Sequence, residues 1–240
     1  VGDLFNLLEA GLQGELQYPQ EREWKRVLAP FVCDSLDVIQ NARCILLEGS
    51  LGVMRDIDYG IFPYVTSSSC LPAVPGVPAP TRIIGVFKVY CTSVGAGPFP
   101  TEIVGPLAEH LREVGGEYGT TTGRPRRIGW FDAVAARYAA EVAGFTEIVL
   151  TKADVLSGFD EVKVCVEYEV DGRPIRKMLL TAKLERAKPV YETFLGWKSI
   201  LGREFTRFTE RVVDLVGVPL TMVGYGRDRH SILQKERIPV

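Results

Sequence analysis

Residues 147–154 read Glu-Ile-Val-Leu-Thr-Lys-Ala-Asp. The first five form a short, apolar, β-branched run, which is typical of a strand buried on both faces of a parallel sheet. Two charged residues, Lys152 and Asp154, follow directly where this strand should end. In open α/β sheets, ligands bind outside the carboxyl ends of the strands. The stretch therefore predicts a buried strand with a polar site at its end.

The segments on both sides repeat this pattern. Short apolar runs alternate with segments whose apolar residues recur every three to four positions, as in amphipathic helices. Strands that alternate with helices predict an α/β fold with a largely parallel central sheet and flanking helices. The expected strands are residues 44–48, 82–90, 147–151 and 219–224, and the expected helices are residues 106–114, 130–143 and 199–215.

Two further segments extend this α/β core. Residues 161–170 alternate apolar and polar side chains, and Asp171-Gly172 separates them from residues 173–184, which predicts an antiparallel hairpin appendage with one solvated face. Residues 3–42 are expected to be mostly helical, while the four prolines of residues 72–80 indicate a loop. One face of the N-terminal helix would carry Trp24, Val27, Leu28, Phe31, Val32, Leu36 and Ile39.

Composition places the chain among globular proteins. Its 240 residues are 46% hydrophobic and 24% charged, which suits a single domain over residues 1–240 and not a string of modules. With 28 basic and 30 acidic residues, the net charge is −2, so broad attraction to nucleic acid or to an anionic membrane is not expected. No apolar run reaches the roughly 20 residues that span a bilayer.

The cysteines favour a reducing compartment. All five are scattered, without a Cys-x-x-Cys pair, so neither a disulfide framework nor a cysteine zinc site is expected. Cys44, Cys91 and Cys165 lie in apolar runs and should be small core residues. Because the chain begins at Val1 without a signal-type segment, we expect a cytoplasmic protein that is truncated at its N-terminus.

Glycine-rich or polar clusters follow each expected strand of the sheet. These are residues 49–52, 94–97, 152–154 and 224–226. Each one alone could be an ordinary strand-to-helix turn. Four of them at consecutive strand ends favour a ligand site along one edge of the sheet.

Residues 119–127, Gly-Thr-Thr-Thr-Gly-Arg-Pro-Arg-Arg, are the most unusual segment of the chain. Glycines allow close approach of a ligand to the backbone, and hydroxyls and amides can donate to anionic oxygens. The arginine side chain is a planar fork suited to a carboxylate or a phosphate. The segment predicts an anion-binding loop; the alternative is a solvated basic turn before a helix.

The Lys152-Ala153-Asp154 tripeptide suits recognition of guanine. An Asp carboxylate can accept hydrogen bonds from N1–H and the exocyclic amine of guanine, a donor pair that adenine lacks, while the Lys stem can lie over the purine ring. The alternative is that Asp154 caps the next helical turn. His110 and His230 lie in no catalytic motif, and Glu48, Asp56 and Asp58 are expected to be structural or capping residues and not metal ligands.

The sequence resembles the adenylosuccinate synthetase family from end to end, from residues 1–5 (Val-Gly-Asp-Leu-Phe) to residues 226–229 (Gly-Arg-Asp-Arg). The strings that carry the resemblance are residues 60–68, 94–102, 117–127, 129–132, 150–156, 162–166 and 189–192. The family's fold is related to that of P-loop NTPases. Its reaction joins IMP and L-aspartate at the expense of GTP, with Mg²⁺ as cofactor, in a homodimer.

The resemblance implies roles for individual residues. One group would grip the aspartate carboxylates, a second would bind GTP, and a third would contact IMP. The first group is Thr120, Thr121, Thr122, Arg124 and Arg126; the second is Lys152, Asp154, Gly224 and Gly226; the third is Thr66, Val94 and Leu51.

The chain departs from the family pattern in three places. No position matches the phosphate loop, with its base aspartate and lysine, the general-acid histidine, the arginines that reach IMP across the dimer, or the Mg²⁺ ligands, all of which precede the matched stretch. Leu51 stands where the family has a glutamine that contacts the purine base, and residues 66–71 depart from its Thr-Ser-Ser-Asn-Thr-Thr run. Three functions stay open: a synthetase that is inactive without its N-terminal part, a relative acting on another purine nucleotide, and a non-catalytic nucleotide-binding or interaction protein.

Overall fold

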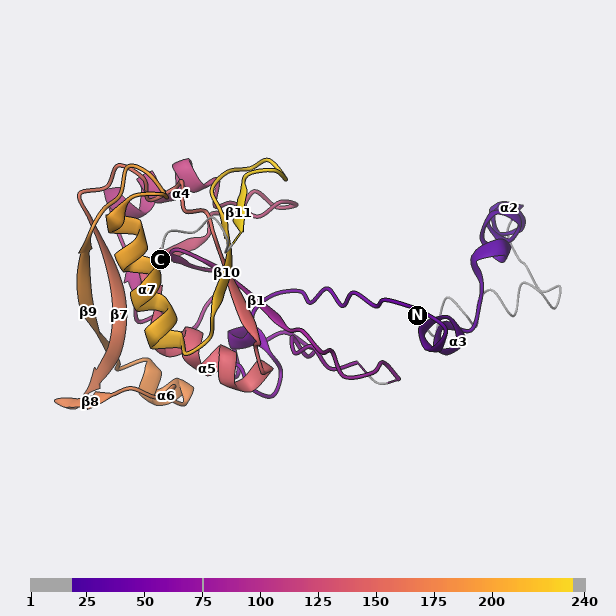
Figure 1. The fold of residues 1–240 in the computed structure, drawn as a ribbon. Helices are drawn as coiled ribbons and strands as arrows, with labels where there is room; N and C mark the ends of the chain where they lie inside the picture. The colour runs from indigo at the N-terminus through magenta and orange to yellow at the C-terminus, as the bar shows by residue number, and fades with distance from the viewer. Residues whose placement is uncertain (1–18, 75, 235–240) are drawn as a thin grey trace. The chain divides into compact units, whose positions relative to one another are not determined.

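A computed structural model describes residues 19–74 and 76–234. The chain forms two compact units, residues 1–47 with 73–79 and residues 48–72 with 80–240 (Figure 1). Every candidate site residue belongs to the second unit.

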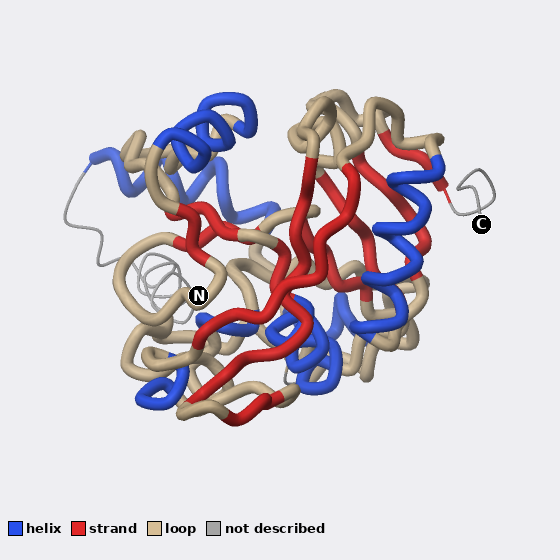
Figure 2. The backbone as a smooth tube through the Cα atoms, turned by 90° about the vertical axis from the view of Figure 1, so that its left-hand side faces the viewer, coloured by secondary structure: helices blue, strands red, loops and turns tan. Residues whose placement is uncertain are grey.

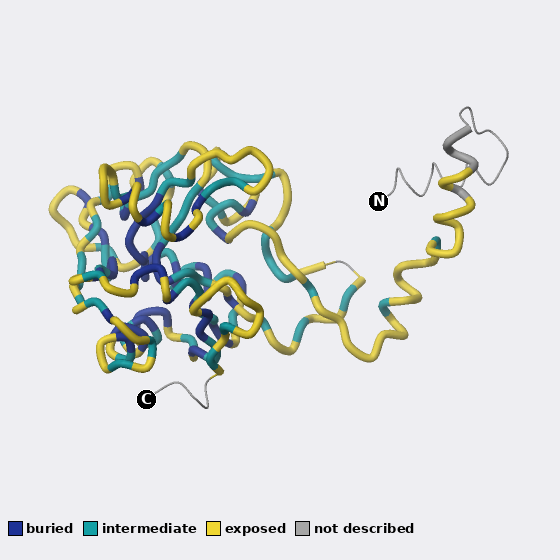
Figure 3. Tube along the Cα trace, turned by 90° about the horizontal axis from the view of Figure 1, so that it is seen from above, coloured by how far each residue is buried: buried dark blue, intermediate teal, exposed yellow. Residues whose placement is uncertain are grey.

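The first unit holds short helices in its described part. These are α2 (Pro19–Leu28), the 3₁₀ turn η1 (Ala29–Phe31) and α3 (Ser35–Gln40). Pro30 lacks an N–H group, so a continuous helix is unfavourable there, and Asp34 starts α3 by accepting the amide of Leu36 at 2.9 Å. Residues 19–42 are therefore mostly helical, as expected, but they form separate short helices, and residues 3–18 lie outside the described part. The apolar face predicted over residues 24–39 is mostly exposed (Figure 3).

The expected strand at residues 44–48 is not formed. Its residues are in irregular structure, and both Cys44 and Leu46 are exposed, which also corrects the expectation that Cys44 is a core residue. A strand buried on both faces needs hydrogen-bonded neighbours, and no described strand pairs with this segment. Cys165 is buried as expected, and Cys91 is half-buried.

The central sheet of the second unit is largely parallel, as predicted. Its strand order is β1 (Ile84–Lys88), β6 (Glu147–Thr151), β10 (Leu220–Gly224) and β11 (Ile232–Gln234). The first three strands are parallel, and β11 is antiparallel to β10. Since β6 lies between two strands, its near-continuous apolar sequence is explained.

Three amphipathic helices accompany the sheet close to where the sequence predicts them. They are α4 (Pro106–Gly115), α5 (Ala133–Ala143) and α7 (Arg203–Val216). Each ends at a glycine in the left-handed conformation, Gly116, Gly144 or Gly217, which costs glycine no steric penalty. Asp132 caps α5, so the residues before it form the short strand β5 (Phe131–Asp132) instead of helix.

A second sheet contains the predicted hairpin. Strand β7 (Glu161–Val170) turns through Asp171 and Gly172, both with positive φ, into β8 (Arg173–Ile175). The hairpin ends sooner than expected, because β8 has three residues and the helix α6 (Thr181–Leu184) follows. The long antiparallel partner of β7 is β9 (Lys188–Leu195), which lies beside it (Figures 1 and 2).

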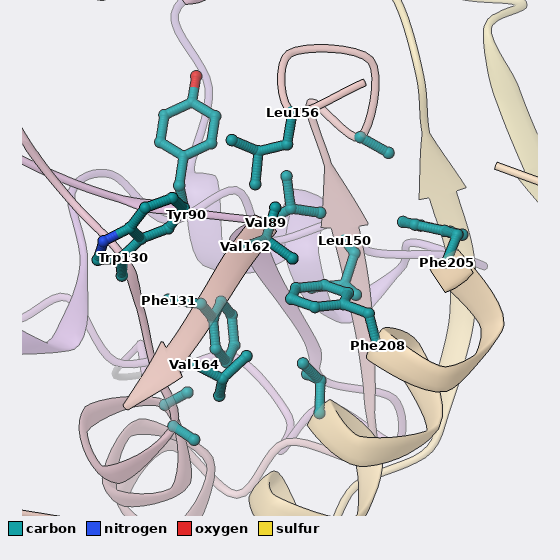
Figure 4. Packing of buried hydrophobic residues seen from close by; sticks show 14 of the residues in the cluster. Val89, Tyr90, Trp130, Phe131, Leu150, Leu156, Val162, Val164, Phe205 and Phe208 are labelled. Atoms are coloured by element: carbon teal, nitrogen blue, oxygen red, sulfur yellow. The ribbon is translucent and has the colours of Figure 1, made fainter. Parts of the chain in front are cut away.

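The main core joins both sheets through α7. Phe205 and Phe208 of α7 meet Leu150 of β6 and Val162 and Val164 of β7 (Figure 4). Buried Trp197 packs edge-on against Phe205, with ring centroids 4.9 Å apart. Its indole N–H donates to the carbonyl of Ala153 at 2.9 Å, so the core directly holds the turn that follows β6.

Asp132 gives the fold a pH dependence that can be measured. The carboxylate is buried and accepts the hydroxyl of Tyr168 at 2.7 Å, but burial dominates and raises the pKa of Asp132 from 3.8 to about 6. Between these pKa values the folded chain holds a proton that the unfolded chain releases, so this group lowers the free energy of unfolding as pH rises from about 4 to 6.

We expect Asp132→Asn to remove this contribution. The measurement is urea unfolding of both proteins at pH 4, 5, 6 and 7. The free energy of unfolding of the unmodified chain minus that of the variant should fall by about 2.4 kcal/mol between pH 4 and pH 7. A difference that stays constant with pH would show that Asp132 ionises as readily in the folded chain as in the unfolded one.

Candidate functional site

The ends of β6 and β10 bring two of the predicted clusters together. Val223 of β10 lies in register with Leu150 of β6, and the amide of Ala153 donates to the carbonyl of Gly224 at 3.1 Å. Residues 152–154 and 224–226 are therefore neighbours at one edge of the parallel sheet, as predicted.

The other two clusters do not lie at this edge, contrary to expectation. Residues 49–52 follow no strand. Residues 94–97 follow β2 (Cys91–Ser93), which belongs to a separate antiparallel sheet with β4 (Arg127–Gly129) and β3 (Glu102–Ile103). The four clusters therefore do not form one row: only residues 152–154 and 224–226 are neighbours at the end of the parallel sheet.

The turn after β6 carries an exposed carboxylate, that of Asp154. Lys152 adopts a left-handed conformation with φ of 59°, which redirects the chain immediately after the strand. Asp154 follows on the exposed side of the turn, and within the described residues no hydrogen bond to its carboxylate is found. No helix begins there, so the capping alternative for Asp154 is not supported.

Two glycines border this turn. A Cβ atom on Gly224 would lie 3.6 Å from Thr151, an ordinary contact. A Cβ on Gly226 would come within 2.8 Å of the Ser231 hydroxyl, and the amide of Tyr225 donates to the carbonyl of Ser231 at 3.0 Å. Close packing of this loop therefore favours glycine at position 226.

The predicted anion-binding loop, residues 119–127 and called the anion loop below, forms the tip of a tight hairpin. The amide of Gly119 donates to the carbonyl of Arg124 and the amide of Gly123 to the carbonyl of Gly119, each at 2.8 Å. The hairpin base is tied to α4, because Nε of Arg112 donates to the carbonyl of Arg126 at 2.9 Å. Residues 120–124 are exposed, and among the described residues no partner is found for the Arg124 guanidinium. This geometry presents hydroxyls and a guanidinium on a fixed turn, as an anion site requires.

The arginines of this segment differ in how many of their guanidinium donors already make hydrogen bonds within the protein. Arg127 makes two bonds to the Glu102 carboxylate, at 2.7 and 2.5 Å, and one to the carbonyl of Gly97 at 2.8 Å. The guanidinium of Arg126 makes one bond, from Nη1 to Oε2 of Glu117 at 2.7 Å. Arg124 and Arg126 therefore retain donors for a ligand, whereas Arg127 fixes residues 95–97.

Glu117 joins the anion loop to the turn after β6. Its side chain is 0% exposed and accepts bonds from Lys88 at 2.8 Å, from the hydroxyl of Tyr90 at 2.7 Å and from Arg126. The ammonium of Lys152 lies 3.6 Å from the same carboxylate and also donates to the carbonyl of Gly115. Two predicted sites thus share one buried group.

Of the three remaining candidate residues, Thr66 and Val94 contact Arg55. Its guanidinium donates to the carbonyl of Val94 at 2.9 Å, and its own carbonyl accepts the amide of Thr66 at 2.8 Å. Leu51 is exposed, with a positive φ of 65°, just before the 3₁₀ turn η2 (Val53–Arg55). A cavity of about 410 Å³, lined in part by Tyr64, lies beside this group.

Sequence reasoning missed Glu117 and Arg55. Both act through partners distant in sequence, so spacing alone could not reveal them. Glu117 did carry one signal: it is the single acid at the edge of a segment with three arginines. Asp56, by contrast, is structural as expected, since it is buried and accepts four hydrogen bonds, including one from the amide of Cys70 at 2.6 Å.

The described residues gather no metal-ligand set. Across residues 19–74 and 76–234, no three His, Cys, Asp or Glu side chains converge as a metal site would require. They do not fit the Mg²⁺ that the resemblance implies, and no chemical step proposed for this chain passes through it. In the same ranges, no helix has the length and apolarity that crossing a membrane requires.

A family model described as adenylosuccinate synthetase matches residues 4–233. The chain belongs to the adenylosuccinate synthetase family. The adenylosuccinate synthetase of Thermomicrobium roseum is 44% identical over 94% of this chain, and that of Thermotoga maritima is 45% identical over 82%. The chain spans 57% and 50% of the lengths of these two relatives.

Solved structures agree with this family assignment. The fully ligated adenylosuccinate synthetase of Plasmodium falciparum superposes with a TM-score of 0.82 at 30% identity, over 98% of this chain and 62% of that protein. Succinoaminodeoxyadenylate synthetase of cyanophage S-2L, bound to dGMP and dATP, has a TM-score of 0.54 at 20% identity over 86% of this chain and 49% of that protein, which shows the shared fold.

Proposed function

We propose that this adenylosuccinate synthetase homologue recognises GTP and L-aspartate for a ligase that joins IMP and aspartate into adenylosuccinate, GDP and phosphate. The observation that carries the proposal is the sharing of Glu117 between the anion loop and the turn after β6. This arrangement supports a carboxylate-binding role for the loop and a guanine-binding role for the turn beside it, the two recognition tasks that this reaction adds to IMP binding.

GTP would be chosen at the turn after β6. The exposed Asp154 carboxylate is free to accept N1–H and the exocyclic amine of guanine, whereas adenine presents an acceptor at N1 and would leave that carboxylate unpaired. Gly224 and Gly226 border the base, and the stem of half-buried Lys152 offers an apolar surface to the ring.

Aspartate would be gripped at the hairpin tip. Its two carboxylates call for more than one cationic or amide donor, and the tip offers Arg124, the free donors of Arg126 and the hydroxyls of residues 120–122. The loop would hold the amine in place for attack on C6 of the purine, and a fixed geometry of this kind lowers the entropic part of the barrier.

The reaction would proceed in two steps. N1 of IMP gives its proton to a base that no position of this chain matches, O6 attacks the γ-phosphorus of GTP, and the bond to GDP breaks, which releases GDP and leaves a phosphorylated O6. The aspartate amine then attacks C6, the C6–O bond breaks, and phosphate leaves with the electron pair while the amine loses a proton. The residues of this chain would bind and orient GTP and aspartate for these steps.

IMP would lie against the group around Arg55. The Thr66 hydroxyl would meet its phosphate and the Val94 backbone its ribose, while Leu51 offers the base no hydrogen bond. This last point supports a second candidate, a synthetase for another 6-oxopurine nucleotide. Offering IMP, GMP and dGMP in separate reactions with GTP and aspartate, and weighing the products by mass spectrometry, decides between the two candidates. We expect the succinyl adduct from IMP.

The 240-residue chain alone is expected not to turn over. No position of this chain matches the base, the acid or the phosphate-loop lysine, and general acid–base groups each contribute about 10²–10⁴-fold to rate. The measurement is adenylosuccinate formation by the chain and by an N-terminally extended protein that carries those residues. Steady turnover by the chain alone would contradict the assignment. Inactivity of the extended protein would favour a non-catalytic protein. From the family resemblance we also infer that the protein is cytoplasmic and forms a homodimer. Light scattering of the extended protein tests the dimer.

A further inference from the structure

Glu117 is the most completely enclosed charged group of the site. It follows Gly116, the left-handed residue that ends α4, so the end of this helix directs its side chain inward. Lys88, at the end of β1, and Tyr90 hold the carboxylate from the sheet side. With both oxygens bonded, the carboxylate has a fixed orientation.

The electrostatic balance shows why this carboxylate stays charged. Burial alone would raise the pKa of Glu117, but the bonds from Lys88, Tyr90 and Arg126 outweigh it and keep the pKa below its usual range. Three cations, on Lys88, Arg126 and Lys152, surround one anion, and each is partly exposed, by 23%, 29% and 34% of its side chain. The cluster thus presents an excess of positive charge to the surface.

The contacts assign different tasks to the two carboxylate oxygens. Oε2 accepts a hydrogen bond from Nη1 of Arg126 at 2.7 Å, which leaves the rest of the guanidinium group for a ligand. Oε1 accepts Tyr90 and lies 3.6 Å from the Lys152 ammonium, whose stem belongs to the guanine-reading turn. One rigid group therefore sets the directions of side chains from two loops.

We propose that Glu117 is a positioning residue that orients Arg126 for aspartate and Lys152 for the guanine base, and so links the two substrate sites. This inference rests on the proposed function for the identity of the two ligands. Glu117 itself touches neither ligand. Its loss should therefore weaken both substrates together, whereas the loss of either cation should weaken one.

Glu117→Gln tests this linkage, because it removes the charge and keeps the shape. In the N-terminally extended protein, we expect the KM values for aspartate and for GTP each to rise about tenfold, the loss of roughly one charge-assisted bond, with kcat changed by less than about threefold. Glu147→Gln is the matched control: Glu147 is also buried and ion-paired, with Arg82, but lies at the opposite end of β6. The proposal would be overturned if Glu117→Gln and Glu147→Gln gave the same KM values. It would also be overturned if Glu117→Gln raised the KM for only one of aspartate and GTP.

A second measurement on the 240-residue chain needs no catalysis. Hydrogen–deuterium exchange of residues 119–126 and of residues 151–154 should quicken together in Glu117→Gln and in neither segment in Glu147→Gln. If Glu117→Gln does not fold, Glu117→Asp keeps the charge but shortens the reach, and the same paired change is expected. Unchanged exchange in either segment would overturn the role of Glu117. Failure of the unmodified extended protein to form adenylosuccinate would instead overturn the proposed function.

Discussion

Replacing Asp154 with asparagine is expected to raise the KM for GTP about a hundredfold, the loss of roughly two charge-assisted hydrogen bonds at about 1.4 kcal/mol per factor of ten. The carboxylate offers two acceptors to guanine, whereas the amide offers one acceptor and one donor, which faces the exocyclic amine of guanine unfavourably. The KM for aspartate should stay within about twofold, because we propose that aspartate binds elsewhere, at the hairpin tip. Steady-state kinetics in the N-terminally extended protein give both values.

The same substitution should improve the use of xanthosine triphosphate. Xanthine presents N1–H and an oxygen where guanine presents N1–H and an amine, so the asparagine amide matches it with one acceptor and one donor. Asp214→Asn, on the exposed side of α7, is the control for a lost surface charge. If Asp154→Asn leaves the preference for GTP over xanthosine triphosphate unchanged, Asp154 does not read the base.

Arg124→Leu is expected to raise the KM for aspartate about ten- to a hundredfold and to leave the KM for GTP nearly unchanged. The exposed guanidinium can bind a carboxylate through two parallel bonds, a geometry that leucine abolishes and that lysine, as a point charge, does not reproduce. Arg124→Lys should therefore recover only part of the loss. The measurement is the pair of KM values in the N-terminally extended protein.

Arg173→Leu serves as the matched control, because Arg173 is also exposed on a hairpin but lies in β8. A rise of the GTP value with an unchanged aspartate value in Arg124→Leu would make the loop a phosphate site. It would place aspartate elsewhere in the molecule.

Elements whose signals are local were predictable from the sequence. Strand β6 combines a short β-branched run with polar residues at its end, and α4 and α7 have clear apolar faces, so each forms close to its expected position. Residues 44–48 carry the same local signal as β6. They form no strand, because an apolar run becomes a buried strand only where other strands pair with it.

The candidate site was predictable in its parts but not in its connections. The Lys152-x-Asp154 turn and the anion loop follow from residue types and spacing. Their meeting on Glu117 does not, because Lys88, Arg126 and Lys152 reach it from three different segments of the chain. The grouping of Thr66 and Val94 around Arg55 is equally non-local. Tertiary contacts of this kind leave no periodic trace in a single sequence.

The most direct test of the central claim is the formation of adenylosuccinate from IMP and L-aspartate by the N-terminally extended protein, with either GTP or ATP as the only nucleoside triphosphate. We expect product with GTP and a value of kcat/KM about a hundredfold lower with ATP, since adenine cannot donate the two bonds that we propose for Asp154. Equal values with the two nucleotides, or no adenylosuccinate with either, would contradict the claim.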